Sequence, residues 1–142
     1  MDKKKDLASK LRTSGLRPTK QRIRLAEFLF NRNSTFHFTV ENLDKAVNKK
    51  NSENKIALAT IYNTVHAFKK AGHLKEILLK EGRSYFDTNT TSHHHFYDEE
   101  NNELIDIEAN NIELKKFPTP PRGKFIKNVN VIINIDNDTQ NH

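Results

Sequence analysis

The sequence predicts an α+β protein, in which an N-terminal winged helix-turn-helix precedes a small α/β domain. Apolar residues recur at helical spacing up to Gly72 and alternate with polar residues after it, so the period changes from helix to strand. The charge changes too, because residues 1–88 hold 19 Lys+Arg and 9 Asp+Glu, whereas residues 89–142 hold 5 and 9. We therefore expect one domain over residues 1–88, a second over 89–136 and a disordered tail at 137–142.

The stretch from Ala57 to Gly72 is predicted to be the last helix of the first domain. An apolar stripe, which we expect to face a core, is formed by Leu58, Ile61, Val65 and Phe68. Gly72 follows this stripe, at a position where helices commonly end in the left-handed conformation. The opposite side carries small, aromatic, amide and basic side chains: Ala59, Tyr62, Asn63, His66, Lys69 and Lys70.

Further helices are expected before this one. A basic helix over residues 3–14 comes first, and Thr19 caps a second helix over about residues 20–31. In that second helix the apolar residues point to a core and the basic residues point outward: Ile23, Ala26, Phe28, Leu29 and Phe30 against Lys20, Arg22 and Arg24. The segment 36–38 is expected to be a loop, after which Thr39 caps the third helix.

Strand patterns follow Gly72. Residues 73–79 and 84–87 flank a short polar turn and predict a hairpin, which is the wing. The elements expected in the second domain are strands over 93–97 and 103–107, a helix over 109–116, and a last strand in which Val129, Val131, Ile133 and Ile135 alternate. A domain this short with so few core residues is expected to pair with a second copy, so we predict a homodimer.

Composition excludes several classes of protein. The chain has no cysteine, which excludes disulfides, thiolate zinc sites and cysteine catalysis. The charged start lacks an apolar signal region, and no apolar run approaches the roughly 20 residues that a membrane span needs. We therefore expect a cytoplasmic protein with no membrane partner. Neither a phosphate-binding glycine loop nor a nucleophile motif is found, so an enzyme is not expected.

The basic first half indicates binding to a polyanion, and the net charge of the chain is +6. The outward face of the helix that ends at Gly72 suits the major groove of double-stranded DNA. There Asn63 can bridge an adenine and Tyr62 can pack on a thymine methyl. The alternative, an ordinary surface helix, is disfavoured by the wing predicted beside it.

Three consecutive histidines, His93 to His95, follow the predicted hairpin. In a strand the first and third point to one face and His94 to the other. Asp87 precedes them, Asp106 ends the next predicted strand, and His37 lies far upstream. Imidazoles and carboxylates together suit Fe²⁺, Mn²⁺ or Zn²⁺. Spacing alone leaves open the alternative that these histidines are exposed or hydrogen-bonded without a metal.

The sequence resembles the ferric uptake regulator (Fur) family from about Gly15 to Ile135. The matching segments, in order, are Gly15-Leu16-Arg17-Pro18-Thr19, Gln21-Arg22, His37-Phe38-Thr39-Val40-Glu41, Leu58 to Val65, Gly72-His73-Leu74, Tyr85-Phe86-Asp87 and His93-His94-His95-Phe96. Tyr85 to Asn89 followed by the histidines, in a chain without cysteine, looks most like the iron response regulator (Irr) branch.

The resemblance implies a dimeric transcription regulator, mostly a repressor, of iron homeostasis genes that binds an A·T-rich inverted repeat. The regulatory metal ligands that it implies are His37, Asp87, His93, His95 and Asp106. Members of the Irr branch respond to haem, for which the candidate ligands are His93, His94 and His95. The alternative is a peroxide-sensing repressor of the same family that uses bound Fe(II).

The resemblance also implies DNA contacts. A basic residue of the family enters the minor groove at the position of Arg17, which suits an A·T-rich target. The phosphate-binding candidates are Lys20, Arg22, Lys69, Lys70 and Arg83. The DNA-binding residues that we predict are Arg17, Lys20, Arg22, Ala59, Thr60, Tyr62, Asn63, His66, Lys69 and Arg83, with Lys70 as a further phosphate contact.

The chain departs from the family pattern at two places. Asp98 and Asn101 stand where the first Cys-x-x-Cys pair of a structural zinc site would be, so that site is excluded. Asn128 stands where many relatives have a histidine of a second metal site, of which His94 and Glu113 could retain part.

Overall fold

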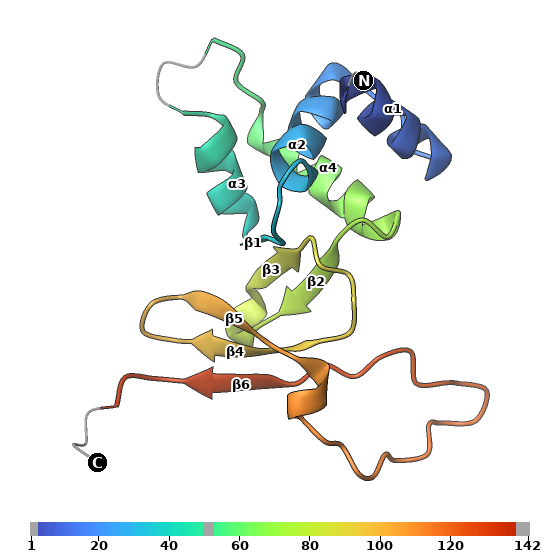
Figure 1. Ribbon diagram of the computed structural model, residues 1–142, viewed down its shortest axis with the longest axis vertical. Helices are drawn as coiled ribbons and strands as arrows, with labels where there is room; N and C mark the ends of the chain where they lie inside the picture. The colour runs from blue at the N-terminus through green and yellow to red at the C-terminus, as the bar shows by residue number, and fades with distance from the viewer. Residues whose placement is uncertain (1–2, 50–52, 139–142) are drawn as a thin grey trace. The chain divides into compact units, whose positions relative to one another are not determined.

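The structure is a computed structural model that describes residues 3–49 and 53–138 (Figure 1). It divides into two compact units, Met1–Thr90 and Thr91–His142, and each is described by itself. The expected α+β class is confirmed, because helices dominate the first unit and short strands the second. Most of the predicted tail, residues 139–142, lies outside the described residues, and Asp136 to Asp138 follow the last strand without regular structure.

Four helices build most of the first unit: α1 (Lys3–Thr13), α2 (Lys20–Phe30), α3 (Val40–Val47) and α4 (Leu58–Lys70). Two of them begin at the expected threonines. The Thr19 hydroxyl accepts from the backbone N–H of Arg22, and Thr39 exchanges hydrogen bonds with Asn42 in a reciprocal capping box. Both helix starts are therefore set by local side-chain chemistry.

The core of the first unit is apolar and continuous. Its buried members are Leu11, Leu25, Ala26, Leu29, Phe38, Val40, Leu43, Val47, Ile56, Ile61, Val65, Phe68, Leu74 and Phe86. Leu58 was expected in this core, but the expectation is wrong because its side chain is 53% exposed. Leu58 is the first residue of α4, and the buried side of the helix starts one turn later at Ile61.

A three-stranded antiparallel sheet completes the first unit, with strand order β1-β3-β2. The expected wing is present as β2 (Lys75–Leu78) and β3 (Ser84–Asp87), joined through a 3₁₀ turn, η1, at Lys80–Gly82. The segment 36–38 was expected to be a loop, and this is wrong, since β1 (His37–Phe38) pairs with β3. A two-residue strand shows no periodicity, and its partner lies far away along the chain.

Hydrogen bonds connect the two ends of the loop before α4. Asn48 closes a ring with Ile56, since its side chain donates to the Ile56 carbonyl and accepts from the Ile56 N–H, both at 2.7 Å. Arg24 was expected to point outward, but its guanidinium instead donates to the carbonyls of Val47, at 2.7 Å, and Asn54. These backbone carbonyls attract the guanidinium, so this arginine braces the start of the helix that carries the candidate DNA face.

The second unit is a three-stranded sheet with order β5-β4-β6: β4 (His94–Asp98), β5 (Glu103–Ile107) and β6 (Ile132–Ile135). Strand β4 runs antiparallel to β5 and parallel to β6. The helix expected over 109–116 is wrong, because only a 3₁₀ turn, η2, forms at Ala109–Asn111 and the chain is extended at Ile112. Asparagines favour turns over helix interiors, and the prolines that follow leave no room for further helical turns.

The last strand begins later than expected, so Val129 and Val131 precede it. Val131 still belongs to the sheet edge, since its carbonyl accepts from the His95 N–H at 3.1 Å. Within the described residues, no helix is long and apolar enough to cross a membrane.

Candidate metal centre and nucleic-acid interface

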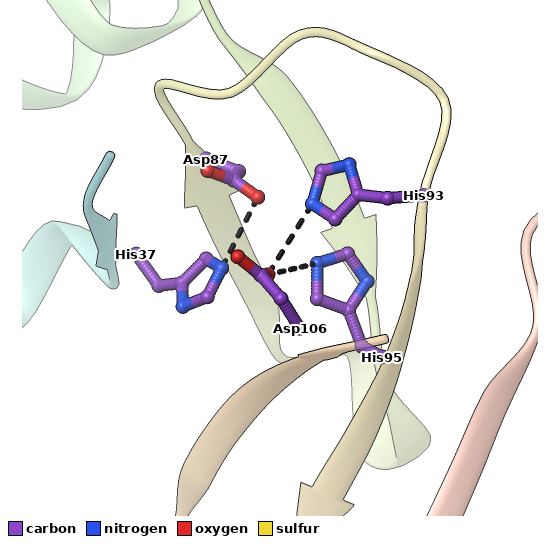
Figure 2. Close-up of side chains that lie close together, drawn as sticks. All are labelled: His37, Asp87, His93, His95 and Asp106. Carbon is purple, nitrogen blue, oxygen red and sulfur yellow. Dashed lines mark ion pairs between the residues drawn. The ribbon is translucent and has the colours of Figure 1, made fainter. Parts of the chain in front are cut away.

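The five expected metal ligands fall into two groups, one in each unit. The first group is His37 on β1 and Asp87 on β3, which are directly opposite in the strand register. The His37 Nε2 lies 3.1 Å from the Asp87 Oδ2, and the Asp87 side chain is fully buried (Figure 2). Thr88 extends the pairing by exchanging hydrogen bonds with the backbone of Phe36, so the two ligands are held face to face.

The second group is His93, His95 and Asp106. His95 and Asp106 are cross-strand partners on β4 and β5, and His93 stands just before β4. The Nε2 atoms of both imidazoles lie 3.3 Å from the Asp106 Oδ1, and Figure 2 shows both rings directed at that carboxylate. The expectation that the first and third histidines share a face is confirmed.

A hydrogen bond fixes the proton of His93. Its Nδ1 lies 2.7 Å from the Thr91 carbonyl, which can only accept, so Nδ1 carries the hydrogen and donates. The Nε2 of a neutral His93 then presents a lone pair on the side of the Asp106 carboxylate, and such a lone pair is what an imidazole offers to a metal ion. Metal-binding histidines commonly have such a carbonyl partner on the other nitrogen.

His94 points to the opposite face of β4. Its Nδ1 accepts from the Val131 N–H at 3.1 Å, so its remaining ring nitrogen carries the hydrogen in the neutral form. The ring borders a shallow hollow lined mainly by apolar side chains: Leu114, Phe117, Ile126 and Val129, with Ser92, Ala109 and Asn128 at its edge. Glu113 does not line this hollow.

The turn at Asp98–Asn101, where the family resemblance would place a cysteine pair, is closed by hydrogen bonds. The Asp98 carboxylate accepts from the N–H groups of Glu100 and Asn101 and, at 2.9 Å, from the Asn101 amide. The Asn101 side chain, followed by these backbone donors, lowers the pKa of Asp98 below its ordinary value. An ionised aspartate and an amide therefore hold this turn without a thiolate ligand.

The candidate DNA face lies on α4. Ala59, Tyr62 and Asn63 are exposed, and Tyr62 has 53% of its surface accessible. Thr60 and His66 are half-buried, and the His66 ring packs against Tyr62 at 4.4 Å between centroids. Asn63, a candidate for contact with base edges, is thus accessible on this face.

The basic candidates differ in their surroundings. Arg17 and Lys20 are exposed near the start of α2, and Arg22 donates to the Arg17 carbonyl at 3.2 Å. Arg83 is exposed at the end of the turn between β2 and β3. Lys69 differs from these, because its ammonium is paired with the carboxylate of Glu76 on β2.

Sequence reasoning missed Glu76 and Ser84. Glu76 accepts from Lys69 and, at 2.6 Å, from the Ser84 hydroxyl, which joins α4 to both strands of the wing. Burial raises the pKa of Glu76, but the hydrogen bonds from Lys69 and Ser84 outweigh it, so the pKa lies below its ordinary value. No local pattern could have indicated this network, since its members come from a helix and two strands.

The fold and the two ligand groups define a class: a winged-helix unit followed by a small sheet unit, each supplying imidazole and carboxylate groups. The sequence model of the Ferric uptake regulator family matches residues 13–133. The chain therefore belongs to this family, which confirms the resemblance at the level of the family.

The chain is similar in sequence to two curated relatives and in fold to a solved structure. The peroxide-responsive repressor PerR of Staphylococcus epidermidis is 36% identical over 80 residues, which cover 56% of this chain and 51% of that protein. The peroxide operon regulator of Bacillus subtilis is 32% identical over 87 residues, covering 61% and 57%. Neither name describes an enzyme. The matched stretch thus spans about half the length of these relatives.

The solved structure is the ferric uptake regulator from Pseudomonas aeruginosa with manganese. It matches with a TM-score of 0.66 and 22% identity, covering 91% of this chain and 96% of that one. This likeness supports the fold over almost the whole chain.

Proposed function

We propose that this protein is a metal-dependent transcription regulator, in which one divalent ion is bound by His37, Asp87, His93, His95 and Asp106. The observation that carries the proposal is the same in both units. In the first unit one imidazole Nε2 faces the buried Asp87 carboxylate, and in the second unit two face the exposed Asp106 carboxylate, all at 3.1–3.3 Å; for His93 the tautomer leaves a lone pair there.

The two groups are tethered closely enough to share an ion. Only five residues separate Asp87 from His93, so their Cα atoms can be at most about 20 Å apart whatever the arrangement of the units. An ion that takes ligands from both units favours the arrangement in which the two groups meet. Metal occupancy would thereby set the position of the DNA-reading unit relative to the second unit.

The chemistry of the ligands limits the ion. Three imidazoles and two carboxylates, without a thiolate, suit Fe²⁺, Mn²⁺ or Zn²⁺. When bound, the ion would supply the positive charge that imidazole nitrogens and carboxylate oxygens can ligate. The protein orients the ligand side chains. The Thr91 carbonyl orients the His93 ring, and the pairing of β1 with β3 places His37 opposite Asp87.

The proposed DNA ligand is an A·T-rich inverted repeat in genes of iron homeostasis. Tyr62 and Asn63 reach base edges from α4, Arg17 enters the minor groove, and exposed basic side chains bind phosphate. The two copies needed for such a repeat would associate through the second unit. Its exposed apolar side chains favour this: Ile105, Leu114, Phe117, Phe125, Ile126, Val129 and Ile133.

The test measures binding of the protein to an A·T-rich inverted repeat by fluorescence anisotropy. It compares the metal-free protein with the Mn²⁺-loaded protein. We expect the dissociation constant to change at least tenfold with Mn²⁺, and Asp106→Asn to remove the change. Asp136→Asn, at an exposed carboxylate outside both groups, is the matched control and should behave as the unaltered protein. Equal DNA affinity with and without Mn²⁺, Fe²⁺ or Zn²⁺ would refute metal dependence.

Peroxide sensing is the second candidate function, and the names of both curated relatives favour it. Bound Fe(II) would react with peroxide and oxidise a ligand histidine. Mass spectrometry of the Fe(II)-loaded protein after peroxide treatment should then show one added oxygen on His37 or His93. An unmodified peptide after complete loss of DNA binding would contradict this candidate.

Haem sensing remains a proposal that rests on His94. His93 and His95 are directed at Asp106, whereas His94 borders an apolar hollow on the other face. Haemin titrated into the unaltered protein and into His94→Ala should give a Soret shift only in the former. An identical spectrum for both would remove His94 as the ligand.

A further inference from the structure

The sheet of the first unit carries two adjacent cross-strand rows. One row is the metal group, His37 opposite Asp87, and the next is Phe38 opposite Phe86. Since successive residues of a strand point to opposite faces, the two rows lie on opposite faces of one sheet. The strand register places Glu76 of β2 opposite Phe86, so the second row runs through all three strands. We call Phe38, Phe86 and Glu76 the seat row.

The seat row contacts α4 at two points one helical turn apart. The edge of Phe86 meets the His66 ring at 5.7 Å and 88°, and the Glu76 carboxylate pairs with the Lys69 ammonium. Phe38 stacks on Phe86 at 5.8 Å, and both rings are buried. His66 in turn packs on the exposed Tyr62. An unbroken series of contacts therefore joins the row next to the metal ligands to the DNA face.

We propose that the seat row transmits the state of the His37–Asp87 pair to the DNA face, and that His66 and Lys69 are positioning residues on α4. The inference rests on the proposed function, in which metal changes DNA affinity. A metal ion that draws His37 and Asp87 to its own ligand distances pulls on β1 and β3, which carry these side chains. The same two strands carry Phe38 and Phe86. A movement of the strands therefore also shifts the Phe86 ring that His66 packs against.

Packed rings respond to such a movement because a buried core has little free space. The helix meets the moving row through two residues three positions apart, so a shift of the row turns α4 about its axis. Tyr62 and Asn63 then change their angle to the groove. His66 and Lys69 act through this placement of their neighbours, without contacting bases or phosphates.

The test measures a coupling ratio, the DNA dissociation constant without Mn²⁺ divided by that with Mn²⁺, for matched variants. Phe86→Leu removes the ring contact between the seat row and His66. Phe68→Leu is the control, because Phe68 is an equally buried ring on α4 that packs on the other side, against Phe30 and His73. We expect the ratio to move at least threefold toward one in Phe86→Leu and to stay unchanged in Phe68→Leu.

A second pair of variants separates positioning from base reading. His66→Phe keeps the ring contacts and removes the ring nitrogens, whereas His66→Ala removes both. We expect His66→Phe to retain the coupling ratio and the preference for the repeat over random DNA, and His66→Ala to lose coupling. Metal affinity, measured by calorimetry without DNA, should be equal in all four variants.

The outcomes separate this inference from the proposed function. A coupling ratio of one in the unaltered protein overturns the proposed function itself. A ratio well away from one that persists in Phe86→Leu overturns the seat row alone. If the coupling ratio fell equally in Phe86→Leu and Phe68→Leu, general destabilisation of the first unit would explain the weaker coupling. This outcome would also overturn the inference.

Discussion

At the scale of single residues, hydrogen-bond partners decide which side chains bind a ligand and which brace the fold. Thr91 sets the tautomer of His93, and Val131 engages His94, so neighbouring imidazoles present different atoms to the two faces of β4. Likewise Lys69 is engaged by Glu76, whereas the adjacent Lys70 is exposed. Adjacent residues of the same type therefore have different roles.

The two lysines should differ in the salt dependence of DNA binding. Each phosphate contact adds about one unit to the slope of log affinity against log salt concentration. We expect Lys70→Met to lower the slope by about one and Lys69→Met to leave it unchanged, because Lys69 already has a carboxylate partner. Equal changes in both slopes, measured by anisotropy at several salt concentrations, would contradict the assignment of Lys69.

His73 should make stability depend on pH. Burial, followed by the charge of Lys10, lowers its pKa below the ordinary value of 6.5, and its Nε2 lies 2.8 Å from the Ser14 hydroxyl. Because the unfolded chain binds the proton more readily, this contribution is complete above pH 6.5 and is lost as the pH falls below it.

Urea unfolding of the metal-free protein at about pH 7.5 and 5.5 tests the role of His73. We expect His73→Gln, which stays neutral, to lose less stability over this interval than the unaltered protein. The same loss in both proteins would assign the pH dependence to the other histidines.

At the scale of elements, local sequence signals were enough to predict the four helices of the first unit. They were not enough to predict strand pairings between segments that are distant in the sequence. Thr39 and the stripe on α4 predicted two elements because caps and periodicity are properties of neighbouring residues. Strand β1 was missed because its only signal is the partner strand β3. The helix expected over 109–116 did not form because its asparagines favour a turn, and only a 3₁₀ turn forms there.

The same reasoning applies to the candidate site. Histidine spacing indicated that His93 and His95 share a face, and the contact of both rings with Asp106 confirms it. The pairing of His37 with Asp87 was implied by family resemblance alone, because their strands meet only in the folded unit. Glu76 was beyond sequence reasoning, since a single glutamate in a strand is ordinarily a solvent-exposed residue.

The capping box of α3 gives a prediction at this scale. Thr39→Ala removes the acceptor for the Asn42 N–H, so we expect a loss of about 1 kcal/mol in the free energy of unfolding. Urea unfolding of the metal-free protein measures it. Thr35→Ala, at an exposed position outside any helix, is the control and should change stability by less than about 0.5 kcal/mol. Equal losses in both would contradict a capping role.

At the scale of the whole molecule, the charge and the apolar surface lie on different units. The first unit carries the basic excess and the candidate DNA face, and the second carries exposed apolar side chains, two on its sheet and five in the segment between η2 and β6. A stable dimer needs a contiguous interface of roughly 1,600 Å² in total. Seven large apolar residues with 37% or more of their surface exposed fit such an interface on the second unit.

Charge substitutions on the second unit should separate the copies. We expect Phe117→Asp and Ile133→Asp each to shift the mass in sedimentation velocity from dimer toward monomer, because a buried carboxylate is costly at an apolar interface. Leu78→Asp is the control, since Leu78 is 65% exposed on the wing of the first unit. A monomeric unaltered protein, or a dimer that survives both substitutions, would contradict the placement of the interface.

The most direct test of the central claim is calorimetric titration of the metal-free protein with Mn²⁺, because the claim is that one ion is shared by two groups. We predict one ion per chain at this site, and a loss of affinity of at least tenfold in both Asp87→Asn and Asp106→Asn. Because both carboxylates serve the same ion, neither single variant should retain a site of unaltered affinity. Two independent sites, each lost in only one variant, would contradict the claim.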